Sequence, residues 1–347
     1  MQPMICAEKN TAAMPGQEAA LAIDRLYGKN ARTAMPVGDD LPPPDEKGCV
    51  ITPFKVFDGI TLLYHDIHTD HLDYGGEAQS FPPDMISIQH CREGRFEGEY
   101  ANGEFFYLGE GDLAINLPET SPAAHSFPLA HYHGINLVIS VGPAQAVLDG
   151  LRAVLGELAI DLAGIRARLQ AGNSLVILRR DPAVEHILSE LYQAQFRMQP
   201  SYLKLKVLEL LLYLSGVDVQ STAMRPYFYK SQVQAVKAMQ QLMTADLETH
   251  FTLEELAGRF QIPLTAMKNC FKGVYGMPIK AYMRRYRLQA AAELLRGTGL
   301  PAAEIGARVG YESPSKFTEA FKKELGRTPT EYRKIACPAG TAPARPE

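Results

Sequence analysis

Two segments near the C-terminus carry mostly polar and basic side chains at the spacing of one helix face. The candidates are Thr265, Lys268, Asn269 and Lys272 in the first segment, and Pro314, Ser315, Lys316, Thr318, Glu319 and Lys322 in the second. Asparagine can form two hydrogen bonds to adenine, and lysine can bond the O6 and N7 atoms of guanine. Glu319 is unusual, because a carboxylate must accept from a cytosine amino group or else repel phosphate. These residues are candidates for contact with double-stranded DNA.

Positive charge is concentrated in the same part of the chain. From Tyr227 to Ile335 there are 17 Lys and Arg against 10 Asp and Glu, a net charge of +7, whereas the remainder holds 18 against 29, a net charge of -11. Further basic residues suited to phosphate contacts are Arg284, Arg285, Arg287 and Arg327. A basic module joined to an acidic one indicates that only the C-terminal part meets a polyanion.

Histidines in the N-terminal half raise the question of a metal site. His65, His68 and His71 are spaced by three, and His131 and His133 by two, so that the latter pair would face one side of a strand. Zinc and iron accept such ligands. However, no Glu follows at the distance usual in cupin metal sites, and the aspartates between the first three histidines suit a polar loop. We therefore predict no metal and no cofactor.

Other catalytic patterns are absent from the sequence. There is no Gly-rich phosphate loop, nucleophile elbow or pair of catalytic carboxylates. The segment from Ile86 to Tyr100 carries His90, Arg92, Arg95 and Tyr100. These side chains could line a pocket for an acidic or phenolic effector, but we favour an exposed hairpin with solvated charges. The chain is therefore not expected to be an enzyme, although a metal-dependent cupin-like enzyme fused to a DNA-binding module remains the alternative.

The N-terminal half is expected to be a β domain preceded by a flexible arm. Residues 1–48 include a Pro- and Gly-rich stretch that cannot bury enough apolar surface to order itself. Over residues 49–142, short apolar runs alternate with turn signals, of which Asn102-Gly103 is the best hairpin signal. The runs are Ile60 to His65, Met85 to Cys91, Phe105 to Leu108, Leu113 to Leu117 and Gly134 to Val141. The pattern predicts a small antiparallel β-barrel, cupin-like, that senses an effector.

Residues 143–220 change to a helical period. Apolar residues recur at spacings of three and four in Pro143 to Leu155, Ile160 to Ala171, Pro182 to Arg197 and Ser201 to Ser215. Apolar stripes this broad could pack on the barrel or pair with a second chain, and we favour a dimer seam in at least one helix. This region is predicted to link and dimerise the protein, giving a homodimer in an α+β chain.

Residues 227–335 contain one pattern twice. Phe271-Lys272 is followed by Gly276, and Phe321-Lys322, fifty positions later, is followed by Gly326. Thr252 with Glu255 has the spacing of a capping box, Ser313-Pro314 suits an N-cap, and Thr328 with Glu331 forms a second box. The long helix from Pro278 to Arg296 would hold the two motifs apart. The sequence predicts an all-α unit of two helix-turn-helix motifs, followed by a disordered tail over residues 336–347.

Residues 230–334 resemble the C-terminal domain of the AraC/XylS transcription regulators. The matching positions are Leu256-Ala257, Phe271-Lys272, Gly276-Met277-Pro278, Arg287-Leu288, Ala291, Leu294-Leu295, Ile305, Val309-Gly310-Tyr311, Ser315, Phe317, Phe321-Lys322, Gly326, Pro329 and Tyr332-Arg333. The resemblance implies seven helices, with recognition helices near 264–272 and 314–323. Pro263 replaces a usual Ser and Gly306 a usual Ala, and each could soften a helix by about 1 kcal/mol.

The expected function is sequence-specific DNA binding in transcription regulation, controlled by a small molecule at residues that the sequence does not identify. The domain order also resembles family members that sense small molecules, including regulators of siderophore uptake. An effector-independent DNA-binding dimer is the other alternative, and RNA polymerase is a possible partner. Residues 1–20 lack the features of a signal peptide, and no apolar stretch approaches roughly 18 residues. A cytoplasmic location without membrane contact is therefore expected.

Overall fold

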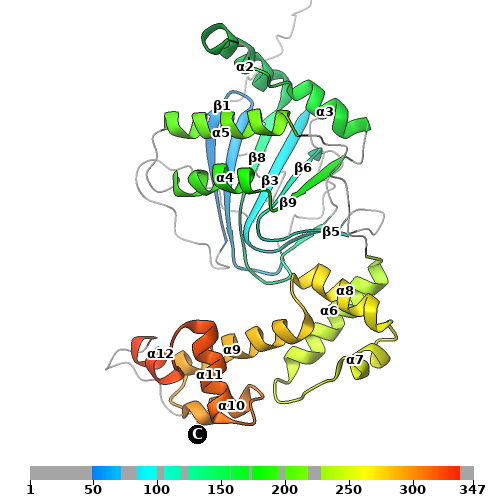
Figure 1. Cartoon of the computed structure of the whole chain (residues 1–347), viewed down its shortest axis with the longest axis vertical. Coiled ribbons are helices and arrows are strands. Elements are labelled where there is room, and N and C mark those ends of the chain that lie inside the picture. Colours follow the sequence, from blue (N-terminus) through cyan, green and yellow to red (C-terminus); the bar gives the residue numbers. More distant parts are fainter. Residues whose placement is uncertain are drawn as a thin grey trace, which may run out of the picture. The chain divides into compact units, whose positions relative to one another are not determined.

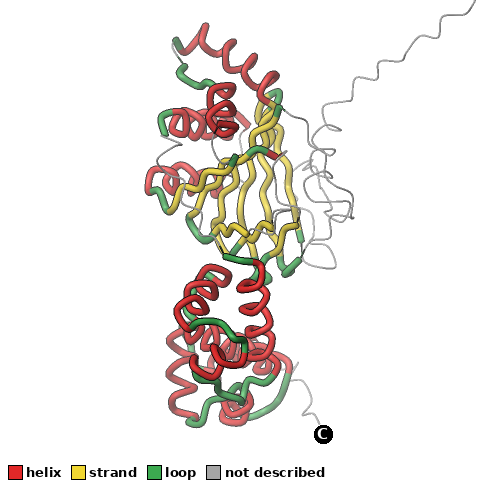
Figure 2. Tube along the Cα trace, turned by 90° about the vertical axis from the view of Figure 1, so that its right-hand side faces the viewer, coloured by secondary structure: helices red, strands yellow, loops and turns green. Residues whose placement is uncertain are grey.

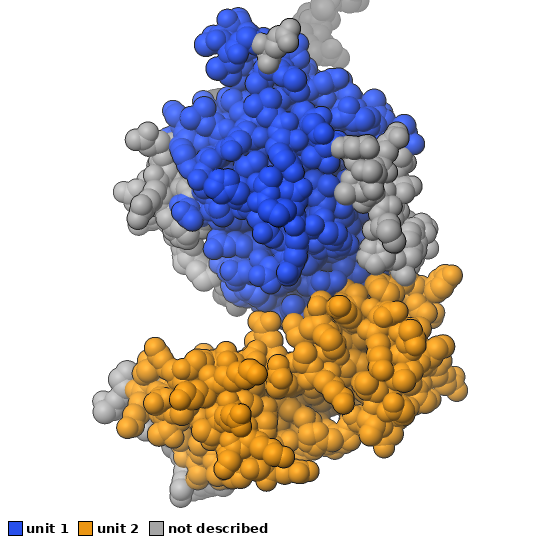
Figure 3. All heavy atoms as spheres, in the orientation of Figure 1, with its two compact units in different colours: residues 1–227 blue, residues 228–347 orange. Residues whose placement is uncertain are grey.

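The protein divides into two compact units, Met1–Tyr227 and Phe228–Glu347 (Figure 3). The computed structural model describes residues 49–71, 84–99, 105–118, 124–156, 158–171, 174–194, 200–217 and 228–336. The arm predicted for residues 1–48 lies outside the described residues, as does the predicted tail beyond residue 336.

The first unit contains two antiparallel sheets (Figure 1). Its described strands are β1 (Val50–Phe57), β2 (Ile60–Ile67), β3 (Met85–Gly94), β4 (Phe96–Glu99), β5 (Phe105–Leu108), β6 (Asp112–Asn116), β7 (Ala124–Ser126), β8 (Tyr132–Ser140) and β9 (Leu175–Arg179). Six strands follow the order β1-β2-β8-β3-β6-β9, and three follow the order β5-β4-β7. All five strands predicted from the sequence are present, and β4 pairs with β5 as the hairpin signal predicted, although the turn itself lies outside the described residues.

The predicted barrel is antiparallel but is not closed. Within the described residues, β1 and β9 end the six-stranded sheet and do not pair with each other. The physical reason is that both faces of this sheet are already covered. Side chains of β2 alternate between them: Ile60, Leu62 and Tyr64 join one core, and Leu63 and Ile67 join the other. Because each apolar face is buried, closure is not needed to remove it from water.

The first core lies between the six-stranded sheet and four helices, which Figure 2 shows on one side of the strands. The helices are α2 (Val141–Leu155), α3 (Leu162–Ala171), α4 (Pro182–Ala194) and α5 (Pro200–Ser215), close to the predicted ranges. Tyr64 in the sheet donates a 2.7 Å hydrogen bond to the carbonyl of Leu191 on α4. Strands and helices therefore share one core. Strand β9 was not predicted from the sequence, because its five residues lie between two helices and pair with the distant strand β6.

The second core of the first unit is aromatic. Phe96 lies 5.7 Å from Phe106, 6.0 Å from Phe127 and 6.0 Å from Tyr132, measured between ring centroids. These rings come from both sheets and pack in tilted or edge-on arrangements, which aromatic pairs prefer. They hold the three-stranded sheet against the six-stranded one. This part of the protein is therefore a sheet sandwich with helices on its outer side.

The described part of the second unit consists of seven helices, as the family resemblance implies. They are α6 (Lys230–Ala245), α7 (Leu253–Arg259), α8 (Leu264–Tyr275), α9 (Ile279–Gly297), α10 (Ala302–Arg308), α11 (Pro314–Leu325) and α12 (Pro329–Ala336). Among the helices that the structure describes, none has the length and apolar character needed to cross a membrane.

Helix α9 joins the two motifs and buries a different face in each half. Its first half buries Ile279, Tyr282 and Met283, whereas its second half buries Leu288, Ala291, Ala292 and Leu295. Burial does not follow one stripe along the whole helix, because Ala290 and Leu294 are only partly buried. Burial shifts around the helix because each half packs against a different motif.

Candidate nucleic-acid interface

Two motifs, α7–α8 and α10–α11, begin their helices with local signals that the sequence predicted. Thr252 and Glu255 form the capping box: Thr252 Oγ1 accepts from the Glu255 amide at 3.1 Å, and Glu255 accepts from the Thr252 amide at 2.7 Å. Hydrogen bonds to the carboxylate, first from the Thr252 amide and then from the Thr252 side chain, lower the pKa of Glu255. Ser313 caps α11 with its side chain, whereas Pro263 caps α8 without a side-chain bond. The first turn of α8 therefore lacks the side-chain hydrogen bond to a backbone amide that Ser313 provides in the first turn of α11.

The two recognition helices, α8 and α11, have the same length, and equivalent positions in them lie fifty residues apart in the sequence. Phe271 and Phe321 are both fully buried. Gly276 and Gly326 end the helices in the left-handed conformation, with φ of 78° and 76°, and each donates its amide to the carbonyl four residues earlier. A residue with a Cβ would be strained there. The constant offset means that each exposed position of α8 has a counterpart on α11.

The outward face of α8 carries the four candidates predicted from the sequence. Thr265, Lys268, Asn269 and Lys272 are all exposed, and their spacing of three and four residues places them on one face. The opposite face is buried through Met267, Cys270, Phe271, Val274 and Tyr275. Packing on one side thus fixes which side chains are presented on the other.

The corresponding face of α11 differs in chemistry. The counterparts of the α8 residues are Ser315, Thr318, Glu319 and Lys322, of which Thr318 is partly buried and the others are exposed. The hydroxyl of Thr318 donates to the Pro314 carbonyl at 2.9 Å, so its hydrogen is used within the helix. Pro314 itself is exposed at the helix start. The face therefore offers fewer hydrogen-bond donors than that of α8, and one of its members is an acid.

Lys316 lies off that shared face. It lines a cavity of about 500 Å³ within the second unit, together with His250, Arg284, Gly310 and other residues of both motifs. Its amide is capped by Ser313 at 3.5 Å. The side chain is exposed and therefore available to a polyanion, but it approaches from the seam between the motifs.

Arg287, which the sequence analysis grouped with phosphate contacts, is used inside the unit. Its guanidinium donates to the Thr249 carbonyl at 3.2 Å and lies 3.2 Å from His250 Nδ1. Burial lowers the pKa of Arg287, and the nearby Tyr311 and Asp246 act in the opposite direction by raising it. His250 Nε2 in turn lies 2.9 Å from the Gly310 carbonyl. Arg287 thus ties α9 to both motifs. Its neighbours Arg284 and Arg285 are exposed, as expected for phosphate contacts.

Two glycines of the second motif are required by its packing. Gly310 has a φ of +83°, and a Cβ there would overlap the Leu247 carbonyl oxygen and lie 3.1 Å from Arg287. A Cβ on Gly306 would lie 2.9 Å from two ring atoms of Phe317. Gly306, which replaces the usual Ala, therefore makes room for the buried ring of Phe317. The replacement does more than lower the helix propensity.

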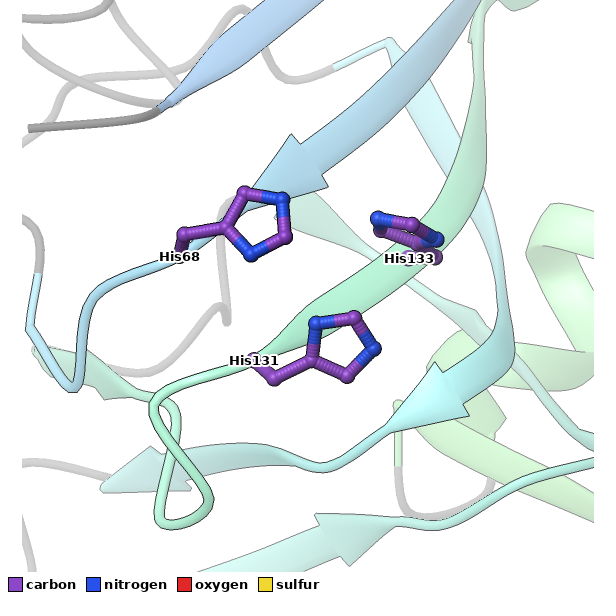
Figure 4. Close-up of side chains that lie close together, drawn as sticks. All are labelled: His68, His131 and His133. Carbon is purple, nitrogen blue, oxygen red and sulfur yellow. The ribbon is translucent and has the colours of Figure 1, made fainter. Parts of the chain in front are cut away.

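The candidate residues of the first unit fall in three places. His65 is buried in β2, and His71 forms an isolated bridge with Ser126. His68 instead joins His131 and His133 (Figure 4). This group of three was not predicted from the sequence, because only the pairing of β2 with β8 brings His68 close to His131 and His133.

The segment from Ile86 to Tyr100 is not the exposed hairpin that we predicted. Its first part is the central strand β3, buried between β8 and β6. His90 is 5% exposed, and its Nδ1 lies 3.0 Å from the Tyr192 hydroxyl. Burial lowers the pKa of His90 to about 4, and the charge of Arg92 adds to this effect. Arg92 packs over the Tyr192 ring at 4.8 Å. Ser87, Gln89 and His90 are therefore parts of a core, whereas Arg92 and Glu93 at the end of β3 are exposed.

The comparisons with known proteins agree with this geometry. A family model described as "Helix-turn-helix domain" matches residues 256–335. The chain is 32% identical over 112 residues to "HTH-type transcriptional activator RhaR" of Yersinia pseudotuberculosis, a match that covers 32% of this chain and 37% of that relative. It is 49% identical over 65 residues to the "F1 operon positive regulatory protein" of Yersinia pestis, covering 19% and 22%. The match thus spans well under half the length of these curated relatives.

Among solved structures, the chain is similar to the C-terminal domain of AraT, a response regulator from Geobacillus stearothermophilus. The identity is 31%, and the match covers 29% of this chain and 84% of that one, with a TM-score of 0.28. Residues 256–335 therefore match a helix-turn-helix domain family, which agrees with the resemblance drawn from the sequence. The matched domain is a DNA-binding domain of the kind found in transcription regulators.

Proposed function

We propose that the whole protein is a sequence-specific DNA-binding transcription regulator, without enzymatic activity, that acts in the cytoplasm. The observation that supports this most directly is the pair of equivalent recognition helices in an AraC-type domain. A recognition helix enters the major groove with one exposed face, while its other face packs on the domain. The exposed faces of α8 and α11 meet this requirement, and the unit that carries them is the basic part of the chain.

Base contacts are assigned mainly to α8. Lys268 and Asn269 are the side chains there with the donors that guanine and adenine accept, and Thr265 lies one turn before them. On α11, Ser315, Thr318 and Glu319 would contribute less, since one is acidic and one uses its hydroxyl within the helix. Lys272, Lys322, Arg284, Arg285 and Arg327 would bind phosphates and fix the register.

A titration of labelled operator DNA tests the proposal. Lys268→Ala and Lys316→Ala should each weaken binding by about 1 to 3 kcal/mol at fixed salt if they contact bases. Lys334→Ala, on α12 and outside both recognition helices, removes the same charge and is the matched control. Footprinting on the DNA upstream of the protein's own gene would supply the operator. Equal affinity for the wild type and the Lys268 and Lys316 variants would remove these residues from the interface.

The first unit is proposed to regulate DNA binding in response to a small molecule. Two observations support this role. The first unit has its own cores of strands and helices. The chain outside residues 227–335 has a net negative charge, which would disfavour contact with DNA. We do not propose the closed cupin-like barrel predicted from the sequence, because the described strands of this unit form an open sandwich of two sheets. Thermal shift of the full chain across a metabolite set, with operator titrations for each hit, tests the role. An effector-independent dimer predicts no hits, and a fused enzyme predicts turnover of a hit.

A homodimer is proposed through α5. Leu205 is 64% exposed, Leu212 is 42% exposed and Tyr202 is 40% exposed, and the three are spaced to share one face of the helix. A second copy of this face would cover them, as helix seams do in two-fold dimers. Sedimentation velocity of the full chain measures this directly. Contact with RNA polymerase is a further proposal, which a two-hybrid assay against polymerase subunits would test.

A further inference from the structure

The histidine cluster is built by the register of three neighbouring strands. In the β2–β8 pair, Asp66 lies opposite His133 and Ile67 opposite Tyr132, so His68 follows opposite His131. Alternation along each strand then places Asp66, His68, His131 and His133 on the same face of the sheet. Four side chains that can bind a metal are thus presented together at one end of β2 and β8.

A bulge in β3 adds a fifth side chain to this face. The pairing of β3 with β8 shifts between Cys91 and Glu93, which sets Glu93 opposite His133. Without the extra residue, Glu93 would follow Cys91 onto the other face, where Cys91 belongs to the aromatic core. Bulges commonly redirect a side chain in this way. Glu93 Oε2 lies 3.6 Å from His131 Nε2 and 3.8 Å from His133 Nδ1.

The imidazole rings converge, as Figure 4 shows. One nitrogen of each ring lies within 4.8 Å of a nitrogen of the other two. Ring centroids are 5.3 Å apart for His68 and His131, 5.6 Å for His68 and His133, and 4.7 Å for His131 and His133. A tetrahedral ion with nitrogens at 2.0–2.1 Å needs those nitrogens roughly 3.3 Å apart. The rings are partly exposed, so small rotations can close this difference without disturbing a core.

The carboxylates complete the arrangement. Asp66 Oδ1 lies 2.7 Å from His68 Nε2 and is bonded to His133 Nε2, so two histidine nitrogens already meet at one oxygen. Glu93 faces the other nitrogen of His133, the position from which a carboxylate orients a metal-binding imidazole. With neutral imidazoles, the two carboxylates contribute a charge of -2, part of which Arg92 offsets at 3.7 Å from Glu93. This charge matches a divalent cation.

We propose that Asp66, His68, Glu93, His131 and His133 form a binding site for a divalent transition-metal ion of the zinc class. The three histidines and Asp66 are the ligands, and Glu93 orients His133. Imidazole-rich sites select zinc, cobalt, nickel or iron over magnesium and calcium, which prefer oxygen. This replaces the expectation of no metal, which rested on the missing Glu of a cupin motif; here a bulge supplies a glutamate from another strand. The inference does not depend on DNA binding.

Titration of Co²⁺ and Zn²⁺ into the full, untagged chain tests the site. We expect one Co²⁺ per chain with the visible absorption bands of a tetrahedral ion, and these bands should be lost on adding one Zn²⁺ but not on adding Mg²⁺. His131→Ala should abolish the bands, and Glu93→Gln should lower the Zn²⁺ affinity by about 10- to 100-fold. His186→Ala, an exposed histidine on α4 outside the cluster, is the matched control and should bind as the wild type does.

Three results would overturn the proposal. They are no saturable Co²⁺ binding by the wild type, unchanged binding in His131→Ala, and equal losses in His131→Ala and His186→Ala. Far-UV circular dichroism of each variant checks folding, and His68→Ala provides a second ligand variant should His131→Ala unfold. His68 follows the end of β2 and is about half exposed, so its removal leaves the sheet cores intact.

Discussion

Replacing Gly310 with alanine should open the second helix-turn-helix motif. At a φ of +83° an alanine is strained by about 1 to 2 kcal/mol. Its Cβ also overlaps the Leu247 carbonyl oxygen and lies 3.1 Å from Arg287, and such overpacking costs about 1 to 3 kcal/mol. We therefore expect Gly310→Ala to destabilise this motif by about 2 to 5 kcal/mol.

Two other glycines provide matched controls. Gly326 has a φ of +76° but nothing within 4 Å of an added Cβ, so Gly326→Ala should cost only the strain, about 1 to 2 kcal/mol. Gly258 is helical, exposed and also has open space around it, so Gly258→Ala should stabilise by about 0.4 to 1 kcal/mol. The same chemical change is thus expected to have three different outcomes.

Hydrogen exchange of the full chain, followed by mass spectrometry, measures the stability of the DNA-binding unit independently of the first unit, because each peptide is assigned to its own helix or strand. Peptides from α10 and α11 should exchange at least about tenfold faster in Gly310→Ala than in the wild type, since 1.4 kcal/mol corresponds to a factor of ten. Gly326→Ala should fall between the two. Exchange within a factor of two of the wild type, or a larger effect for Gly326→Ala than for Gly310→Ala, would refute the reasoning from the overlap with Leu247.

Three further outcomes follow from other contacts. Thr252→Ala removes the capping box and should destabilise α7 by about 0.5 to 2 kcal/mol, measured by hydrogen exchange against Thr330→Ala, an exposed position on α12. His90 stays neutral in the folded protein down to a pKa of about 4, whereas the unfolded chain takes up its proton below about 6.5. Burial of His90 should therefore contribute a loss of about 2 kcal/mol in stability between pH 7 and pH 5, and urea unfolding of His90→Gln should show a loss smaller by about this amount than that of the wild type. Leu205→Glu should shift sedimentation toward the monomer, and a dimer unchanged by it would exclude the α5 face.

The sequence by itself determined most of the DNA-binding unit. Its signals are local: the capping boxes at Thr252 and Thr328, the glycines that end α8 and α11, and the repeat that places Phe271 and Phe321 at equivalent buried positions. Each depends on residues within a few positions of each other. The exposed candidates could be named for the same reason, because the buried face of a helix defines the opposite one.

Other properties of the same unit depended on contacts distant in sequence. Arg287 has the type and charge of a phosphate contact, but the tertiary structure turns it toward Thr249 and His250. Gly306 looked like a loss of helix propensity until the Phe317 ring was placed beside it. Neither fact is local, since each partner lies in a different element.

The first unit was the part that only the tertiary structure decided. Its strands are readable from alternation, but their order is not, because β2 pairs with β8 and β6 pairs with β9 across long connections. The grouping of His68 with His131 follows from that register, and the bulge in β3 that brings Glu93 to the same face leaves no signal in the sequence. A one-residue change in register would move these side chains to the opposite face of the sheet.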